Sequence, residues 1–445
     1  MQAAIYRRYL LGLLTVILLF NYVDRLALGI VLEDIKADLN LTDTQLGFLS
    51  GIAFALFYSV MGIPIARWAD RGNRVAIIAL TVLLWSVAVA LCGTAASFVQ
   101  LLLIRVAVAV GEAGCIPAAL SLIANYFSRA ERPRANAIYG LGSALSLVVG
   151  FFLAGWLNQF FGWRITFVVL GAPGLVLAAL AWFTLKEPRT ARSPEVPAAA
   201  VAAAPLAQQP RLREVCRTLW QNKTFRLLLI CQAVMFFFNN GIGLWLPTFY
   251  VRSHGLSSGQ IGTSLAIAWG LGGLAGAYLG GAWASRYAAN NERLQLQVVG
   301  IAIAAGGVLM GLVCWVPSTY LSIALLALVS VALSASYGPL FATIQTLVPE
   351  NMRAVSLAIV YLFANLIGMG FGPLAAGTLS DAFGPWAGAE SLRYALIVLA
   401  PGFVWGGWFA WRAARSVSHD LASLQADGES IGLDATVGIP AQVTR

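Results

Sequence analysis

The stretch SLVVGFFLAGWLNQFFG, residues 146–162, returns in altered form as GMGFGPLAAGTLSDAFG at residues 368–384. The copies match at two internal glycines, an alanine, a leucine and the final Phe-Gly. A second pair is LTDTQLG at 41–47 and LSSGQIG at 256–262, which lie 215 positions apart. Small residues at four-residue spacing by themselves indicate only close helix packing, whereas matched offsets indicate a duplicated unit. The sequence therefore predicts two halves with the same fold.

The composition indicates a membrane protein with many spans. Of 445 residues, 59% are hydrophobic and only 11% are charged. Crossing the hydrocarbon core takes roughly 20 apolar residues in a helix. Stretches of that length predict an all-α membrane protein with twelve transmembrane helices, at 9–32, 44–66, 75–95, 98–126, 134–160, 164–185, 224–251, 259–285, 294–316, 319–347, 354–380 and 391–412.

The spans divide the chain into an N-terminal six-helix half (1–185), a cytoplasmic linker (186–223), a C-terminal six-helix half (224–412) and a flexible cytoplasmic tail (413–445). The middle of the linker, SPEVPAAAVAAAPLAQQP, is rich in alanine and proline, as flexible linkers are. Two halves that run in the same direction form a parallel repeat, which predicts a substrate site between them near the middle of the membrane.

Basic residues favour one side of the predicted membrane. They include Arg7, Arg8, Arg67, Arg71, Arg74, Arg129, Arg132, Arg134 and those of the linker, whereas Glu33, Asp34, Asp38 and Asp43 gather on the other side. By the positive-inside rule, both termini are cytoplasmic and the protein is an integral protein of a cell membrane, the inner membrane in a bacterium. The net charge of +9 is spread over separate loops, so we expect no nucleic-acid partner.

Five cysteines without paired spacing indicate neither a disulfide framework nor a metal cluster. An enzyme acting on lipids would require a metal with paired carboxylates, a Ser/His pair or a His-rich motif, and both histidines, His254 and His419, lie outside the predicted spans. We therefore expect no catalytic residues and no metal, and we predict that the protein is not an enzyme.

The segment NYVDR, residues 21–25, places two charges inside the first span. At 1.5 Å per residue, Asp24 lies roughly 22 Å and Arg105 roughly 20 Å above the inner boundary, with Glu112 about 10 Å above it. An isolated charge at mid-membrane costs roughly 3 kcal/mol or more, so we expect Asp24, Arg25, Arg105 and Glu112 to face inward, two acids against two bases.

This arrangement predicts two roles. Asp24 and Glu112 are candidates for proton coupling, because protonating one of them leaves a surplus positive charge. Arg25 and Arg105 are candidates for binding an anionic head group, because a guanidinium matches phosphate and carboxylate. The alternative is a static salt-bridge network that only fixes helix packing.

The duplication offers an internal comparison. At the 215-residue offset Asp24 and Arg25 correspond to Asn239 and Asn240, and Glu112 corresponds to a position near Ser334, so the second half keeps polar side chains without charge. Further candidates for the cavity wall are Tyr58, Tyr139, Phe236, Trp245, Tyr337, Tyr361 and Asn365, although aromatic residues of this kind also face lipid or pack between helices.

The loop ARWADRGNR, residues 66–74, resembles the loop between helices 2 and 3 of the major facilitator superfamily, roughly G-x-L-A-D-R-x-G-R-R. Ala66 and Asn73 replace two glycines of that pattern, while Asp70, Arg71 and Arg74 keep it. In the superfamily this loop is taken as a cytoplasmic gating latch, which these three residues would form here with helix ends of the other half. Arg105 with Gly111, Ala113 and Gly114 resembles the helix 4 motif, and GMGFGPLAAG resembles the Gly/Pro motif.

Within the superfamily, FNYVDR followed by GEAGCIPAALSLIANYF (111–127) and DRGNR resembles the spinster-like group. The resemblance implies proton-linked transport of a lysophospholipid or sphingoid lipid by rocker-type alternating access. The alternative is a proton-coupled porter or exporter of small organic anions or hydrophobic drugs. We expect protons as the coupling ion, no other cofactor, membrane lipids and an amphipathic substrate as partners, and a monomer.

Overall fold

The computed structural model describes residues 2–128, 130–188, 212–349 and 352–423, and within these the regular secondary structure is helical, without strands. The N-terminal half contains α1 (Gln2–Leu39), α2 (Asp43–Ser50), α3 (Ile52–Arg71), α4 (Arg74–Cys92), α5 (Phe98–Ala113), α6 (Cys115–Tyr126) and α7 (Arg132–Thr184). The C-terminal half contains α9 (Leu212–Gln221), α10 (Lys223–His254), α11 (Ser258–Leu265), the π-helix η1 (Ala266–Leu271), α12 (Gly272–Tyr287), α13 (Glu292–Trp315), α14 (Thr319–Thr346), α15 (Arg353–Phe363), the π-helix η3 (Ala364–Phe371), α16 (Gly372–Ala387), η4 (Gly388–Glu390), α17 (Ser391–Leu399) and α18 (Gly402–Ala413). The middle of the predicted linker and the end of the predicted tail lie outside the described residues.

Ten helical segments of the described chain are long and apolar enough to cross a membrane, and the two longest, of 53 and 59 residues, are each long enough to cross it twice. The 53 residues of α7 would extend to about 80 Å if straight, but Gly162 (φ 76°) reverses the helix. Both ends of α7 therefore lie beside the start of α1, where Arg7 pairs with Glu131 at 2.5 Å and Tyr9 contacts Thr184 at 2.7 Å. The long segment Val355–Ala413 contains a similar reversal at Gly388 (φ 55°). The predicted fold class, with twelve crossings, is confirmed.

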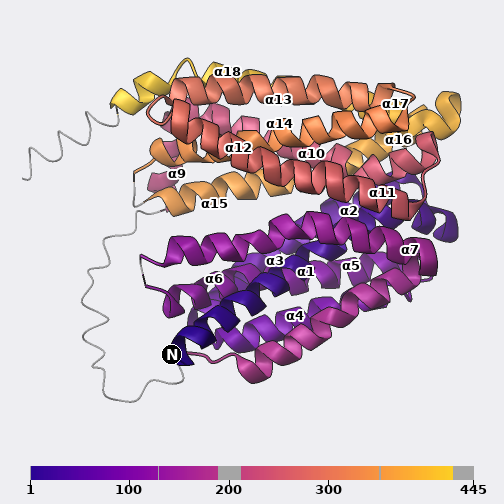
Figure 1. The fold of residues 1–445 in the computed structure, drawn as a ribbon, viewed down its shortest axis with the longest axis horizontal. Coiled ribbons are helices and arrows are strands. Elements are labelled where there is room, and N and C mark those ends of the chain that lie inside the picture. Colours follow the sequence, from indigo (N-terminus) through magenta and orange to yellow (C-terminus); the bar gives the residue numbers. More distant parts are fainter. Residues whose placement is uncertain (1, 129, 189–211, 350–351, 424–445) are drawn as a thin grey trace, which may run out of the picture.

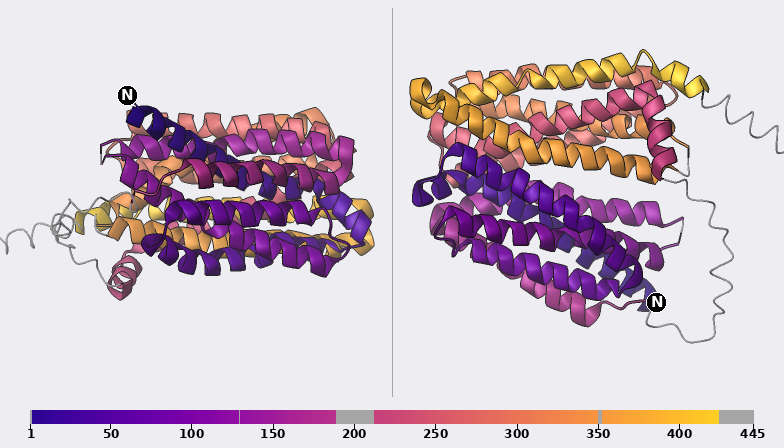
Figure 2. Two further views of the ribbon diagram at one scale, coloured as in Figure 1. Left: turned by 90° about the horizontal axis from the view of Figure 1, so that it is seen from below. Right: turned by 180° about the vertical axis from the view of Figure 1, so that it is seen from behind.

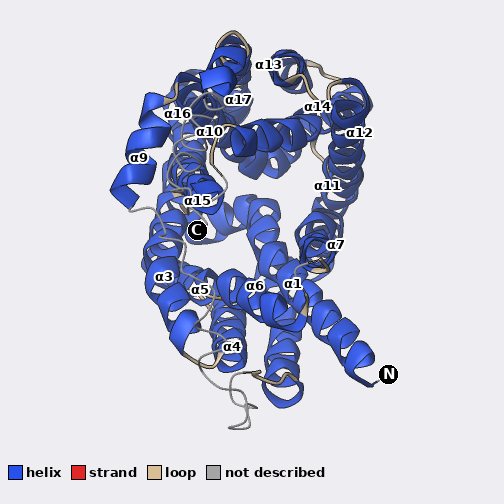
Figure 3. Ribbon diagram, turned by 90° about the vertical axis from the view of Figure 1, so that its left-hand side faces the viewer, coloured by secondary structure: helices blue, strands red, loops and turns tan. Residues whose placement is uncertain are grey.

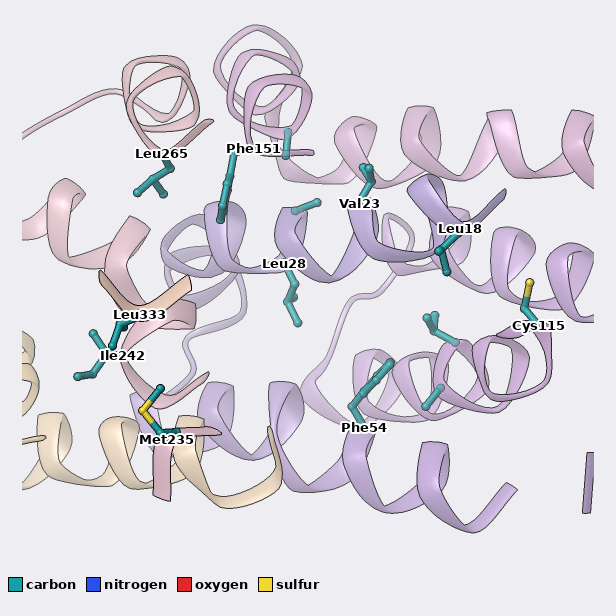
Figure 4. Packing of buried hydrophobic residues seen from close by; sticks show 14 of the residues in the cluster. Leu18, Val23, Leu28, Phe54, Cys115, Phe151, Met235, Ile242, Leu265 and Leu333 are labelled. Carbon is teal, nitrogen blue, oxygen red and sulfur yellow. The ribbon is translucent and has the colours of Figure 1, made fainter. Parts of the chain in front are cut away.

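The crossings form two bundles that lie side by side (Figures 1 and 2). One bundle contains α1 to α7 and the other α10 to α18; Figure 3 views them along the helices. We call the end of the molecule that carries the start of α1 the inner end, and the opposite end, which carries the α1–α2 turn, the outer end. Buried apolar side chains such as Leu28, Phe54, Met235 and Ile242 fill the bundles near the plane where they meet (Figure 4).

Two seams join the halves, and they are related by the duplication. In the first seam α2 packs against α16, and in the second α11 packs against α7. Gly47 lies on the backbone of Pro373, and Gly262 lies in the same way on the backbone of Phe151. Gly47 and Gly262 are 215 positions apart, and Phe151 and Pro373 are 222 positions apart. These are the offsets of the two pairs of repeated stretches. A Cβ at either glycine would collide with the opposite backbone, so glycine is what permits this approach.

Each seam also has a helix start that is capped by the other half. The carboxylate of Asp381 accepts hydrogen bonds from the backbone amides of Asp43 (3.1 Å) and Thr44 (2.7 Å) at the start of α2. At the matching position of the second seam, Gln159 Oε1 accepts a hydrogen bond from the backbone amide of Gly259 at 3.0 Å, at the start of α11. One seam thus uses a carboxylate and the other an uncharged amide.

The first seam carries an additional set of ion pairs at the outer end. Arg252 of α10 donates to Asp43 through both terminal nitrogens, at 2.7 and 2.8 Å, and through Nε to Glu33 at 2.9 Å. Lys36 also pairs with Asp43 at 2.7 Å, and the Ser380 hydroxyl donates to it at 2.6 Å. These ion pairs and the two capped helix starts tie the halves together at the outer end.

Five spans that the sequence predicted as continuous are irregular near mid-depth. Those at 98–126 and 391–412 are interrupted at Gly114 and at Ala400–Pro401. The span predicted at 44–66 breaks at Gly51 (φ −99°, ψ −97°), which lies against the Gly370 carbonyl of the other half. The spans predicted at 259–285 and 354–380 each contain a π-helical stretch, η1 and η3. Gly51 plus 215 is 266, the first residue of η1, so the irregularities in α2–α3 and α11–α12 occur at matching places of the duplicated unit. Such irregularities often mark functional sites, because they free backbone groups and leave space between helices.

Candidate functional site

A charged cluster lies inside the N-terminal half, between α1 and α5. Arg105 Nη1 lies 3.3 Å from Asp24 Oδ2, and Arg25 donates through Nε to Glu112 Oε2 at 2.6 Å. Asp24 and Arg105 are each 2% exposed and Glu112 is fully buried. Residues 24 and 25 point about 100° apart on the helix, which is why each one has its own partner on α5. The structure thus brings the four predicted charges together as two acids and two bases.

The two acids are also electrostatic neighbours, and each faces both Arg25 and Arg105. Within the described part of the protein, Asp24 Oδ1 and Glu112 Oε1 are both buried and accept no hydrogen bond. Two ionised carboxylates have no hydrogen to share, whereas a single proton would supply the missing donor. The geometry therefore leaves one buried acceptor oxygen on each of the two acids without a donor.

Aromatic rings surround the two guanidinium groups. Arg25 Cζ lies 5.0 Å from the ring centre of Tyr22 and 4.8 Å from those of Phe54 and Tyr58. Arg105 Cζ lies 5.4 Å from the ring centre of the same Phe54. Rings at this distance attract a cation through their negative faces. The aromatic rings therefore stabilise the two guanidinium groups even though the side chains around them are apolar.

A cavity of about 240 Å³ lies beside this cluster, between the two halves. Arg25 and Arg105 contribute the charge on its N-terminal wall, and Asn239 and Asn240 contribute polar side chains on the opposite wall. Most of the remaining lining is apolar and comes from both halves, namely Leu26, Leu28, Phe54, Leu147, Phe151, Leu244, Leu246, Leu265, Trp269, Met369 and the two prolines Pro247 and Pro373. The cavity therefore has positive charge on its N-terminal wall and a mainly apolar lining elsewhere. Such a lining suits a ligand with one polar end.

The other predicted wall residues lie in several places. Phe236, Tyr337, Phe341 and Tyr361 form a ladder of ring contacts with centres 5.2 to 6.5 Å apart. The exposed Tyr361 at its end lies near enough to Tyr22 of the other half to interact with it. This ladder therefore extends the aromatic surface outside the cavity itself.

Four further candidates do not line the cavity in this structure. Trp245 is fully buried, because its indole packs against α16 and donates to the Pro373 carbonyl at 3.0 Å. Tyr139 is 4% exposed and lies near Tyr22 and Tyr58. Ser334 of α14 faces Gly273 of α12, and Asn365 is half-buried in η3.

The predicted gating loop is only partly described. The side chains of Asp70 and Arg71 lie outside the described residues. Arg74 is fully buried and contacts its own half: its backbone amide and Nε donate to Glu187, at 2.7 and 3.2 Å, and Nη1 donates to the Ser121 carbonyl at 3.0 Å. In this conformation Arg74 therefore holds the end of the sixth crossing against the start of the third, and the expected latch between the halves stays a prediction.

Sequence reasoning missed two features of the site. Phe54 carries no sequence signal, since it is one apolar residue in an apolar helix. Asp381 and Gln159 could have been found, because both occupy the same position of the two repeated stretches and both are polar.

A duplicated bundle of twelve crossings with a charged cavity between its halves defines a membrane transport protein of the secondary-transporter class. Residues 14–373 match the Major Facilitator Superfamily model. The chain belongs to the Major Facilitator Superfamily, in its spinster-like group. The fold and family are those of transporters, which are not enzymes.

Individual relatives agree with this assignment. An MFS-type efflux pump of Mycolicibacterium smegmatis is 32% identical over 416 residues, covering 92% of this chain and 93% of the relative. Protein spinster homolog 1 of Xenopus tropicalis is 25% identical over 437 residues, covering 90% and 79%. A bacterial homologue of the human lysosomal transporter Spinster, crystallised in an inward-facing, unoccupied conformation, superposes with a TM-score of 0.78 at 30% identity and covers 93% of this chain and 98% of its own.

Proposed function

We propose that this protein is a proton-coupled secondary active transporter of an amphipathic lipid, of the lysophospholipid or sphingoid phosphate type. The observation that carries the proposal is the cavity with Arg25 and Arg105 on one wall, an apolar lining elsewhere and two acids directly behind the guanidinium groups. Phosphate binds well to a guanidinium, and the apolar lining suits the first part of a hydrocarbon chain.

The proposed coupling follows from the charge of the cluster. With Asp24 and Glu112 ionised, the two acids balance Arg25 and Arg105. One proton taken up between the acids leaves a surplus positive charge beside the cavity, which favours an anionic head group there. Proton occupancy and substrate occupancy are then linked, and each changes the relative stability of the two orientations of the halves.

A cavity of about 240 Å³ holds a head group but not a whole lipid. The acyl chain therefore extends toward the inner end, along the aromatic ladder that ends at Tyr361. We propose that the inner end faces the cytoplasm, as the distribution of arginines favours, so that the described conformation is closed outside. The same proposal places the protein in the inner membrane of a bacterium as a monomer, with no cofactor besides the transported proton, no nucleic-acid partner and no enzymatic activity.

The direct test is transport in proteoliposomes with an imposed pH gradient and a panel of lysolipids, sphingoid phosphates and small anions. Saturable flux of an anionic amphiphile that follows the gradient supports the proposal. A folded protein that moves none of the panel contradicts it.

Arg25→Ala should weaken binding of an anionic amphiphile by ten- to a hundredfold, since a hydrogen bond to a charged group contributes about 1.5–3 kcal/mol. Binding of the uncharged analogue with the same chain should change far less. The measurement is the dissociation constant of both compounds by titration of the purified protein, with Arg25→Lys as the variant that keeps the charge. Equal losses for the two compounds would rule out a head-group role for Arg25.

Asp381→Ala should loosen the first seam, because the start of α2 loses a charged acceptor for two backbone amides. A reporter is Ser50→Cys, a cavity position that reagents from outside reach only when the seams open. Cys216, the exposed cysteine of α9, is replaced by serine to remove background. We expect impermeant maleimide to label the reporter about tenfold or more faster in Asp381→Ala.

The matched control for this experiment is Gln159→Ala in the second seam, where a neutral acceptor is removed and a smaller increase is expected. Identical labelling of Asp381→Ala and the unaltered protein would show that this cap does not hold the outer end closed.

The second candidate function is export of small organic anions or hydrophobic drugs. The similarity to an efflux pump favours it, as does the mainly apolar lining of the cavity. A competition experiment distinguishes the two functions. A drug exporter would transport compounds that lack an anionic group, and lysolipids would inhibit that transport only weakly.

A further inference from the structure

Phe54 is the ring that the two guanidinium groups of the site share. It lies on α3, is 2% exposed, and its ring centre is 4.8 Å from Arg25 Cζ and 5.4 Å from Arg105 Cζ. Of the two arginines, Tyr22 and Tyr58 in contrast lie beside Arg25 and not beside Arg105 in the described part of the chain. The Phe54 ring is also stacked on Tyr58, with centres 5.8 Å apart and planes inclined by 17°. The Phe54 ring is therefore held between the two guanidinium groups and the ring of Tyr58.

The attraction between a ring and a cation matters most where a cation lacks a counter-ion in a water-poor site. When Asp24 and Glu112 are both ionised, each guanidinium has its own carboxylate and the ring adds little. When one proton is held between the acids, two guanidinium groups share one negative charge. The ring then faces the surplus cation, so it stabilises the protonated cluster more than the unprotonated one.

We propose that Phe54 is a positioning residue that sets the pH at which the cluster takes up its coupling proton. The proposal deepens the proposed function and rests on it. Phe54 has no group that can hold the proton; it acts through Arg25 and Arg105. Without the ring the protonated, cationic cluster is less stable, so a higher proton concentration is needed to form it.

The other titratable groups near the cluster do not change the expected direction of the pH shift. The charged groups that face the acids are Arg25 of α1 and Arg105 of α5. The remaining neighbours are the thiols of Cys92 and Cys115 and the phenols of Tyr22 and Tyr58, groups that ordinarily titrate well above the range of carboxyl groups. Among these described groups, the proposed coupling proton is therefore assigned to the two carboxyl groups.

The ring is also placed where movement of the halves can reach it. Phe54 follows the helix break at Gly51 by three residues, and Gly51 lies against the Gly370 carbonyl in η3 of the other half. A change at the first seam therefore shifts the backbone that carries the ring. Through this link the orientation of the halves can change how strongly the cluster holds its proton.

The test is the pH dependence of lysophospholipid binding to the purified full-length protein, compared with that of Phe54→Leu. The leucine variant should show the midpoint of its pH profile moved about one unit toward acid, a tenfold change in proton affinity. Phe54→Tyr, which restores a ring, should return the midpoint to that of the unaltered protein. Phe57→Leu on the same helix, whose side chain is 37% exposed and which contacts neither arginine, should leave the profile unchanged.

A second substitution guards against misfolding of the leucine variant. Ring-fluorinated phenylalanine at position 54 weakens the negative face of the ring and keeps its shape, so the midpoint should move further toward acid with each added fluorine. An unchanged midpoint, or a shift toward alkali, in this series overturns the role of Phe54. That failure is distinct from failure of the proposed function, which would appear as an unchanged pH profile when Asp24 and Glu112 themselves are neutralised.

Discussion

Asp24→Asn and Glu112→Gln are each expected to reduce proton-driven accumulation of substrate to background while the protein stays folded. The reason is that the proposed coupling proton is held by the two buried carboxyl groups, and either substitution replaces one of them with an amide that does not titrate. An amide keeps the size of the side chain and still accepts a hydrogen bond, so the paired arginine keeps a partner. A fixed neutral side chain cannot bind and release the coupling proton, and the two orientations of the halves lose their dependence on pH.

The measurement is uptake into proteoliposomes with and without a pH gradient, together with exchange of labelled for unlabelled substrate without a gradient. We expect exchange to persist in at least one variant, because it does not require the net movement of a proton. Asp38→Asn is the matched control, since Asp38 is an acid of the same helix that is half exposed at the outer end and pairs with Arg164. If both site variants keep gradient-driven uptake, the carboxyl pair is a static packing element.

Glu187→Ala is expected to destabilise the folded protein by about 3–5 kcal/mol, because it leaves a buried guanidinium without its carboxylate. Arg74 is fully buried, and Glu187 accepts hydrogen bonds from both its side chain and its backbone amide. Among the described residues, the Ser121 carbonyl and hydroxyl would remain as partners of the charged group. We expect a clear fall in the midpoint of thermal unfolding in detergent.

The double substitution Arg74→Met with Glu187→Met is the informative control, because replacing a whole buried ion pair by apolar side chains is often neutral or stabilising. Glu131→Ala supplies the second control: Glu131 is exposed and its partner Arg7 is only half-buried, so its loss should change the unfolding midpoint little. If Glu187→Ala unfolds like the unaltered protein, Arg74 has an alternative acceptor when Glu187 is absent.

The repeated stretches around residues 150 and 372 were sufficient to predict the architecture from sequence. The length of a membrane crossing is set by the bilayer, so apolar runs alone locate the helices, and matched offsets reveal the duplication. The cost of a charge in hydrocarbon likewise singled out Asp24, Arg25, Arg105 and Glu112, and counting residues along the helices placed Asp24 and Arg105 at the same depth.

The sequence did not determine which acid meets which base, or that Phe54 lies beside both arginines. Nor could the packing of Trp245 against α16 or the binding of Arg74 to Glu187 be predicted from the sequence. These contacts depend on the rotation of one helix against another and on backbone irregularities such as Gly51, which arise from packing between segments far apart in the chain. Periodicity tells how deep a residue lies and roughly which face it occupies, but only the packed helices decide which side chain stands opposite.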